Sequence, residues 1–205
     1  MKYLKSKLFI SLFATLLIFG FCMAKPAQTQ AAEVESKNMV RWMKICDNMA
    51  NNIEKKHFVY SNSSTKSTYR AAVKKRKRTN CALYVSWCLQ QYGAFKSGQT
   101  IYIRRGSSSI KKNFSRWSGK VQVIRVNKRA SRVNLKKGDI VLWNSLGHTN
   151  IYAGENASGD RLWYDAGKSA TYSHSSGSRF ENIGKKTQGY LNSKNISYII
   201  RIKGL

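Results

Sequence analysis

The chain has 205 residues, of which 42% are hydrophobic and 12% aromatic, which suits one globular core with an additional segment rather than a disordered chain. Its 37 lysines and arginines outnumber its 9 acidic residues and give a formal charge of +28, which predicts attraction to polyanions. One proline, four cysteines and no visible repeat exclude collagen-like, solenoid and disulfide-scaffold proteins.

Residues 1–32 have the pattern of a secretory signal peptide. Lysines near the start precede an apolar run over residues 8–23, and small residues follow it. The run of about 15 residues is at the lower limit for a membrane-spanning helix, so we expect cleavage after Ala31 or Ala32. Cleavage removes four of the 37 basic residues and no acidic one, which leaves 33 against 9, a net charge of +24. For a secreted protein of this charge we expect anionic wall polymers, and no specific nucleic acid, as partners.

The rest of the chain divides into an N-terminal segment, residues 33–58, and a domain over residues 59–205. Apolar residues recur at three- and four-residue steps in the first segment, which predicts an amphipathic helix. The domain begins with polar residues, a short helical pattern at 69–73 and a basic run at 74–78. We interpret the basic run as a solvated face or loop.

A second helix is predicted over residues 80–92, because this stretch is apolar on nearly all sides. Thr79 is placed as its N-cap and Gly93 as its stop. After it the apolar period changes to two, which predicts strands at 101–103, 121–126, 139–143, 148–154, 161–167 and 196–202. Helices followed by antiparallel strands indicate an α+β fold.

Cys81 is the candidate nucleophile. At the second position of the predicted helix it faces the positive end of the helix dipole, beside five cationic side chains, so we expect its thiolate to be favoured. The alternative is a small apolar core residue, which suits Cys46 and Cys88. Cys81 and Cys88 lie about 10.5 Å apart along a helix, too far for a disulfide. A bond between Cys46 and Cys88 stays open.

His148 is the candidate base, because it opens a predicted strand directly after a glycine. His57 and His174, the other two histidines, are expected on the surface. A third group should orient the imidazole.

Asp165 is the candidate orienting group. The strands predicted at 148–154 and 161–167 would form a hairpin. If its turn is centred between Asn156 and Ala157, the residue numbers of each cross-strand pair add up to 313, and His148 faces Asp165. Asn150 is the alternative third group, and a one-step shift in the turn would place Asp165 opposite Asn150 instead. Asp165 could also cap Gly167.

Other chemistries have weaker support. No zinc-protease, paired CxxC or Gly-x-Ser-x-Gly motif is present, so we expect no metal and no cofactor. A two-carboxylate glycosidase would have to draw on Asp139, Glu155 and Asp165.

Three sequence blocks carry a family resemblance. They read NCALYVSWCLQQYG at 80–93, LKKGDIVLWNSLGHTNIYAG at 135–154 and LWYDAG at 162–167. Together they resemble the NlpC-type papain-like cysteine peptidases of bacterial cell walls, with the related CHAP amidases close behind. The resemblance covers roughly residues 38–202. It implies a papain-like fold in which a central nucleophile helix packs on an antiparallel sheet.

The resemblance also implies the roles of single residues: Cys81 as nucleophile, His148 as base and Asp165 as orienting group. Where the family has Asp before the nucleophile and Ser-Gly after it, this chain has Asn80 and Ala82-Leu83. Tyr60 and Tyr69 are the candidates for a tyrosine that the family carries upstream. We expect substrate contacts from three residues: Asn80, Tyr60 and Trp143.

The sequence thus predicts a secreted, monomeric cysteine amidase or endopeptidase that cleaves an amide of peptidoglycan. Three alternatives stay open. The first is a non-catalytic basic module that binds the cell envelope, and the second is a cysteine amidase acting on a non-wall peptide or a small-molecule amide. The third, nucleic-acid binding, requires that residues 1–32 remain uncleaved in the cytoplasm.

Overall fold

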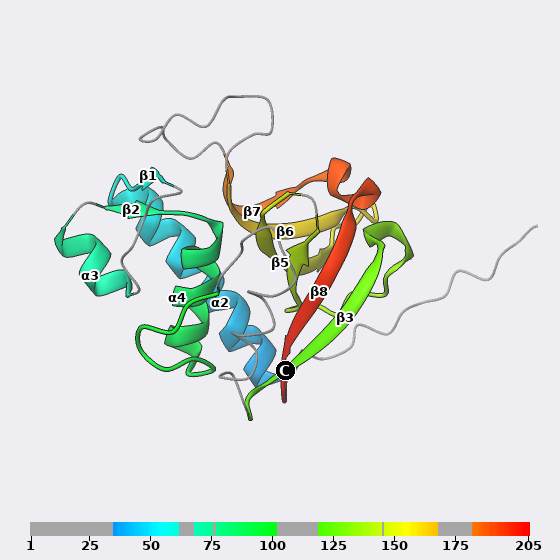
Figure 1. The fold of residues 1–205 in the computed structure, drawn as a ribbon, viewed down its shortest axis with the longest axis horizontal. Coiled ribbons are helices and arrows are strands. Elements are labelled where there is room, and N and C mark those ends of the chain that lie inside the picture. The colour runs from blue at the N-terminus through cyan, green and yellow to red at the C-terminus, as the bar shows by residue number, and fades with distance from the viewer. Residues whose placement is uncertain (1–34, 62–67, 76, 102–118, 145, 168–181) are drawn as a thin grey trace, which may run out of the picture. The chain divides into compact units, whose positions relative to one another are not determined.

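A six-stranded antiparallel sheet dominates the structure (Figure 1). The computed structural model describes residues 35–61, 68–75, 77–101, 119–144, 146–167 and 182–205. The strands lie in the order β3 (Val121–Arg129), β8 (Asn195–Ile202), β4 (Ile140–Trp143), β5 (Thr149–Glu155), β6 (Arg161–Gly167) and β7 (Asn182–Thr187). Every neighbouring pair is antiparallel. A separate parallel pair joins β1 (Val59–Tyr60) to β2 (Arg78–Thr79).

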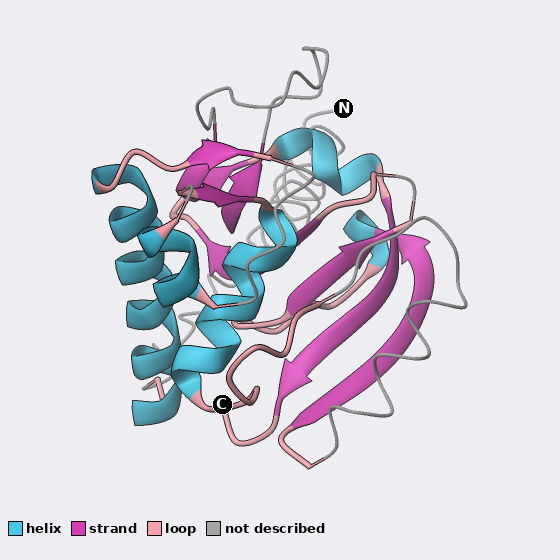
Figure 2. Ribbon diagram, turned by 60° about the vertical axis from the view of Figure 1, so that its left-hand side comes forward, coloured by secondary structure: helices cyan, strands magenta, loops and turns pink. Residues whose placement is uncertain are grey.

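Two helices cover one face of this sheet, α2 (Lys37–Lys55) and α4 (Cys81–Tyr92) (Figure 2). The buried residues of α2 recur on one side of the helix, and Ser36 caps its start by accepting a hydrogen bond from the Met39 N–H. Most of α4 is buried. A third, shorter helix, α3 (Tyr69–Lys74), follows β1. The protein is therefore a mixed α/β structure with helices first and sheet afterwards, as the sequence indicated.

The sheet separates two apolar clusters. Ile140 and Leu142 of β4 pack in the cluster that contains α2 and α4, whereas Val141 and Trp143 pack in a second cluster. The second cluster is completed by two 3-10 turns, η1 (Ala130–Arg132) and η2 (Gly189–Ser193). Alternate residues of one strand therefore stabilise both faces of the sheet.

Gly138 and Asp139 lock the start of β4 to the rest of the fold. Gly138 has a φ of 90°, and a Cβ there would lie 2.9 Å from Leu205 and 3.2 Å from Trp42, so only glycine fits without displacement. The fully buried Asp139 carboxylate accepts two hydrogen bonds of 2.7 Å from the Arg201 guanidinium. Asp139 therefore forms a structural ion pair and is not available as a catalytic carboxylate of a glycosidase.

Some predicted boundaries were wrong. The N-cap of α4 is Asn80 and not Thr79, so Cys81 is the first rather than the second residue of the helix. Gly93 ends α4 in the left-handed conformation, as predicted. Strand β7 was not predicted. Of the expected strand at 101–103 only Ile101 is described, and it lies outside any strand.

Within the described residues, no helix is long and apolar enough to cross a membrane.

Candidate active site

Cys81 sits at the N-terminus of α4, where the helix start is tightly held. The Asn80 side chain accepts a hydrogen bond from the Leu83 N–H at 3.0 Å and donates one to the Ser61 carbonyl at 3.1 Å. The Ser61 N–H in turn donates to the Thr79 carbonyl at 2.9 Å. The pair β1–β2 therefore fixes the position of Cys81, whose exposed fraction is 4%.

His148 contacts both of its expected partners. Its Nε2 lies 3.0 Å from Oδ1 of Asp165, and its side chain also interacts electrostatically with that of Cys81. The Nε2–Oδ1 contact is an ion pair at hydrogen-bond distance, although the N–H direction is not aligned with the oxygen. The Asp165 and His148 side chains are only 3% and 14% exposed, so this contact is largely shielded from solvent screening.

The charges around His148 favour its protonated form. Burial alone would lower the pKa of His148, but the Asp165 carboxylate and then Cys81 raise it well above its usual value. A buried imidazolium between a carboxylate and a thiol is the arrangement in which a cysteine is activated as a nucleophile.

The contact between His148 and Asp165 arises from a different register than the one predicted. In the structure Ile151 pairs with Tyr164, so the residue numbers of the paired residues add up to 315 rather than 313. Extending that register places Asn150 opposite Asp165 and Gly167 opposite His148. His148 therefore reaches Asp165 diagonally, a distance that a long side chain spans.

Gly167 is a site residue that the sequence reasoning did not recognise as one. A Cβ built at Gly167 would lie 3.1 and 3.2 Å from the two Asp165 carboxylate oxygens and 3.2 Å from Cε1 of His148. The missing side chain therefore leaves the space in which the ring and the carboxylate meet.

Gln188 is the second residue that the sequence reasoning missed. Its Nε2 donates a 2.6 Å hydrogen bond to Oδ2 of Asp165, and the residue is only 7% exposed. It directly precedes η2 and follows β7, the strand that had not been predicted. No motif singled it out, because its contact with Asp165 depends on how β7 pairs with β6.

Two tyrosines flank the group formed by Cys81, His148 and Asp165. Burial raises the pKa of Tyr60, and the neighbouring Cys81 and Asp165 raise it further. Its phenol therefore stays protonated at neutral pH. Burial raises the pKa of the half-exposed Tyr190, His148 lowers it, and Asp165 raises it, so the charges of the same pair act on this ring.

Asn150 forms a hydrogen bond with Trp143 and not with His148. The Trp143 Nε1–H donates to Oδ1 of Asn150 at 3.1 Å, and both residues are buried. Trp143 also packs edge-on against Trp163, with ring centres 5.4 Å apart. With an exposed fraction of 3%, Trp143 offers almost no surface to a substrate, which corrects its expected role as a direct contact.

The remaining candidates lie apart from this group. His57 is exposed just after α2, as expected, and His174 lies outside the described residues. Cys46 and Cys88 are buried and free, so no disulfide joins them. Over the described part of the chain, no group of three or more His, Cys, Asp or Glu side chains is arranged to hold a metal ion.

Comparisons with known proteins add no relative. No protein-family model matches the chain, and neither the curated proteins nor the solved structures include a match.

Proposed function

We propose that the protein is a secreted cysteine amidase or endopeptidase that hydrolyses an amide bond in peptidoglycan. The observation that carries the proposal is the placement of His148, whose Nε2 lies 3.0 Å from Oδ1 of Asp165 and whose side chain interacts electrostatically with Cys81. A nucleophile, a base and a group that orients the base form the minimal set for amide cleavage through a covalent intermediate.

The reaction follows from these contacts. The Cys81 thiolate attacks the amide carbonyl, and the imidazolium of His148 gives its proton to the leaving amine. Water, deprotonated by His148, then attacks the thioester and releases the acid and the thiol. Because the Asp165 carboxylate holds the ring, His148 can act in both steps without reorienting.

The start of α4 supplies a donor for the oxyanion. The first N–H groups of a helix have no acceptor within the helix. The Leu83 N–H is used by Asn80, so the Cys81 N–H remains the donor closest to the attacking sulfur. In the tetrahedral intermediate this N–H can bind the negatively charged oxygen.

The papain-like arrangement and the substrate class are proposed from the family resemblance together with this geometry. A cysteine that opens a helix, facing a histidine at the start of a sheet strand, is consistent with that arrangement. Tyr60 and Tyr190 flank the reacting groups and would contact the substrate. Asn80 carries no charge, and its amide is occupied by Leu83 and Ser61, so we do not assign it the binding of a free amino group.

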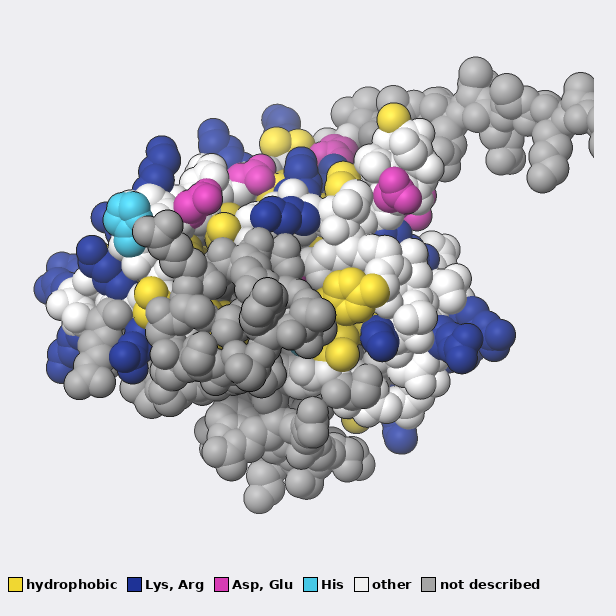
Figure 3. Space-filling view, turned by 90° about the horizontal axis from the view of Figure 1, so that it is seen from above, with side chains coloured by type: hydrophobic (Ala, Val, Ile, Leu, Met, Phe, Trp, Pro, Cys, Tyr) yellow, Lys and Arg dark blue, Asp and Glu magenta, His cyan; other side chains and the backbone are white. Residues whose placement is uncertain are grey.

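The positive charge of the mature chain would concentrate the enzyme on anionic wall polymers. Basic side chains are spread over the face shown in Figure 3 and outnumber the acidic ones there. Because exposed charges are screened by salt, we expect binding to isolated cell walls to weaken steeply as salt rises. Binding that does not change with salt would contradict this part of the proposal.

The test is a direct assay on peptidoglycan. The mature protein, from residue 33, and its Cys81→Ala variant are incubated with purified peptidoglycan, and the soluble fragments are identified by mass spectrometry. We expect new fragments from the unmutated protein alone, and their masses identify the bond. Identical fragment patterns would overturn the hydrolase proposal.

A further inference from the structure

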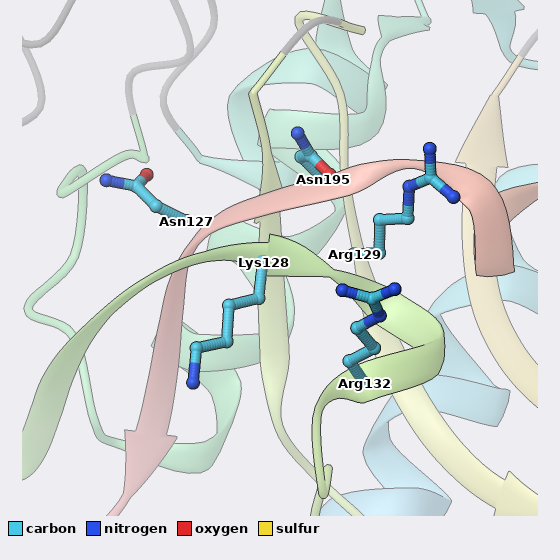
Figure 4. Close-up of a pocket in the computed structure, with 5 residues that line it drawn as sticks. All are labelled: Asn127, Lys128, Arg129, Arg132 and Asn195. Carbon is cyan, nitrogen blue, oxygen red and sulfur yellow. The ribbon is translucent and has the colours of Figure 1, made fainter.

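A basic cavity lies at the β3 edge of the sheet, separated from β5 by β8 and β4 (Figure 4). Its volume is about 540 Å³, within the roughly 300–1,000 Å³ usual for ligand sites. Five side chains line it: Asn127, Lys128, Arg129, Arg132 and Asn195. Three of them are cationic, two are amides, and none is acidic.

A bulge in β3 brings these side chains together. Arg125 pairs with Tyr198, but Lys128 pairs with Ile196, so β3 carries one extra residue at this point. Asn127 takes up the irregularity with a φ of 51°, a left-handed conformation that asparagine tolerates better than most residues. A bulge redirects the side chains beside it, and the chain then turns through η1, which carries Arg132.

The backbone that carries the cations is held in place. The Arg161 guanidinium donates to the Ala130 carbonyl at 2.6 Å and to the Val133 carbonyl at 3.1 Å, on either side of Arg132. The buried Ala130 also donates its N–H to the Lys194 carbonyl at 2.9 Å. The lining side chains therefore project from β3, from the start of β8 and from a fixed turn rather than from a free loop.

No acidic residue in the described part of the chain neutralises the three cations. Among the described residues, none of the ion pairs involves Lys128, Arg129 or Arg132. Like charges gathered around one hollow repel each other, and an anionic ligand removes that repulsion. Two guanidinium groups suit phosphate oxygens in particular, because each can donate two parallel hydrogen bonds.

We infer that this cavity binds the phosphate groups of a phosphodiester polymer. All five lining side chains are exposed, so an extended chain could enter and leave the hollow. No aromatic side chain lines the cavity, whereas single-stranded nucleic acids are bound by stacking of bases on aromatic rings. No apolar side chain lines it either, which argues against insertion into a membrane. The inference rests on the proposed function only for the source of the polymer, the cell wall.

The test compares two variants with equal loss of charge. The first replaces Lys128, Arg129 and Arg132 by glutamine, and the control replaces the exposed Lys44, Lys55 and Lys56 of the α2 region by glutamine. The probe is a synthetic poly(glycerol phosphate) oligomer, titrated calorimetrically into the mature protein at several salt concentrations. Poly-glutamate of the same charge and vesicles of phosphatidylglycerol are the comparison ligands, and circular dichroism checks that both variants are folded.

We expect the cavity variant to bind the oligomer at least about tenfold more weakly, and its slope of log K against log salt to fall by about two units. The control variant should lose less than about threefold. Equal losses in the two variants would overturn the inference in favour of diffuse charge attraction. Equal affinity for poly-glutamate would overturn the preference for phosphate, and binding to the vesicles alone would overturn the polymer as ligand. Because no step uses Cys81, the outcome is independent of the peptidoglycan assay.

Discussion

Gly167 lies beside both His148 and Asp165, and its missing side chain makes room for the contact between them. A Cβ at this position would lie 3.1 Å from one Asp165 oxygen and 3.2 Å from the ring of His148. The arrangement of the proposed site thus depends on a residue with no functional group.

Gly167→Ala tests this dependence. The backbone of Gly167 is not in the left-handed region, so the substitution adds a steric clash without backbone strain. His148 and Asp165 would have to shift by a few tenths of an ångström. Since a displacement of about 1 Å can cost about a hundredfold in rate, we expect a fall of about threefold to tenfold in kcat for amide cleavage. Gly189→Ala is the matched control, because a Cβ there meets no atom within 4 Å. Equal activity of the two variants would contradict the role of Gly167.

Gln188→Ala should reduce kcat by about tenfold with little change in KM. The substitution removes the 2.6 Å hydrogen bond to Oδ2 of Asp165 and leaves the carboxylate less well oriented. A hydrogen bond to a charged group contributes about 1.5–3 kcal/mol. As a positioning residue, Gln188 should also affect the pH profile of kcat, because a less firmly held carboxylate stabilises the imidazolium of His148 less. An unchanged profile combined with a raised KM would indicate a substrate contact instead.

The stability of the fold should fall as pH rises above about 6.5. The pKa of His148 is raised in the folded state, so the folded protein binds more protons than the unfolded chain between pH 6.5 and the raised pKa. The stabilisation is complete below pH 6.5 and is lost as the pH rises through the folded pKa. Thermal unfolding of the His148→Gln variant between pH 6 and 8 should lack this slope.

The control for this pH dependence is His57→Asn, at an exposed position with a φ of 54° that asparagine tolerates. It should keep the slope of the unmutated protein. A slope that survives in His148→Gln would place the titrating group elsewhere.

Asp139→Ala should strongly destabilise the fold. It leaves Arg201 without its bidentate partner and the Lys136 N–H without the acceptor that it reaches at 2.8 Å. Removing one member of a buried ion pair costs about 3–5 kcal/mol, measurable as a lower urea midpoint. Asp160→Ala, at an exposed turn position, should cost less than about 1 kcal/mol. Similar losses would contradict the structural role of Asp139.

The site could be predicted from the sequence only in its residue types. A cysteine after a helix cap and a histidine after a glycine are local patterns, and the structure brings Cys81 and His148 together. The sequence left two registers between β5 and β6 open and could not decide between them, because two features set the register. Asn156 closes a longer turn by accepting hydrogen bonds from the Ser158 and Asp160 N–H groups, and a bulge follows Tyr152.

Strand β7 is the other feature that could not be predicted from the sequence. Its residues, Asn182–Thr187, are mostly polar and show no apolar alternation, so the periodicity that predicted the other strands of the sheet is missing here. Without β7 there was no reason to place Gln188 beside Asp165. The contribution of an edge strand to a site therefore became visible only in three dimensions.

The reactivity of Cys81 tests the central claim most directly. Alkylation of the mature protein with iodoacetamide at pH 6, followed residue by residue with mass spectrometry, compares Cys81 with Cys46 and Cys88. Burial raises the pKa of the Cys46 thiol, and both Cys46 and Cys88 are fully buried, so both should react slowly. We expect Cys81 to react at least about tenfold faster, and His148→Ala to abolish the difference. Equally slow reaction of all three thiols would contradict an activated nucleophile and favour a non-catalytic binding module.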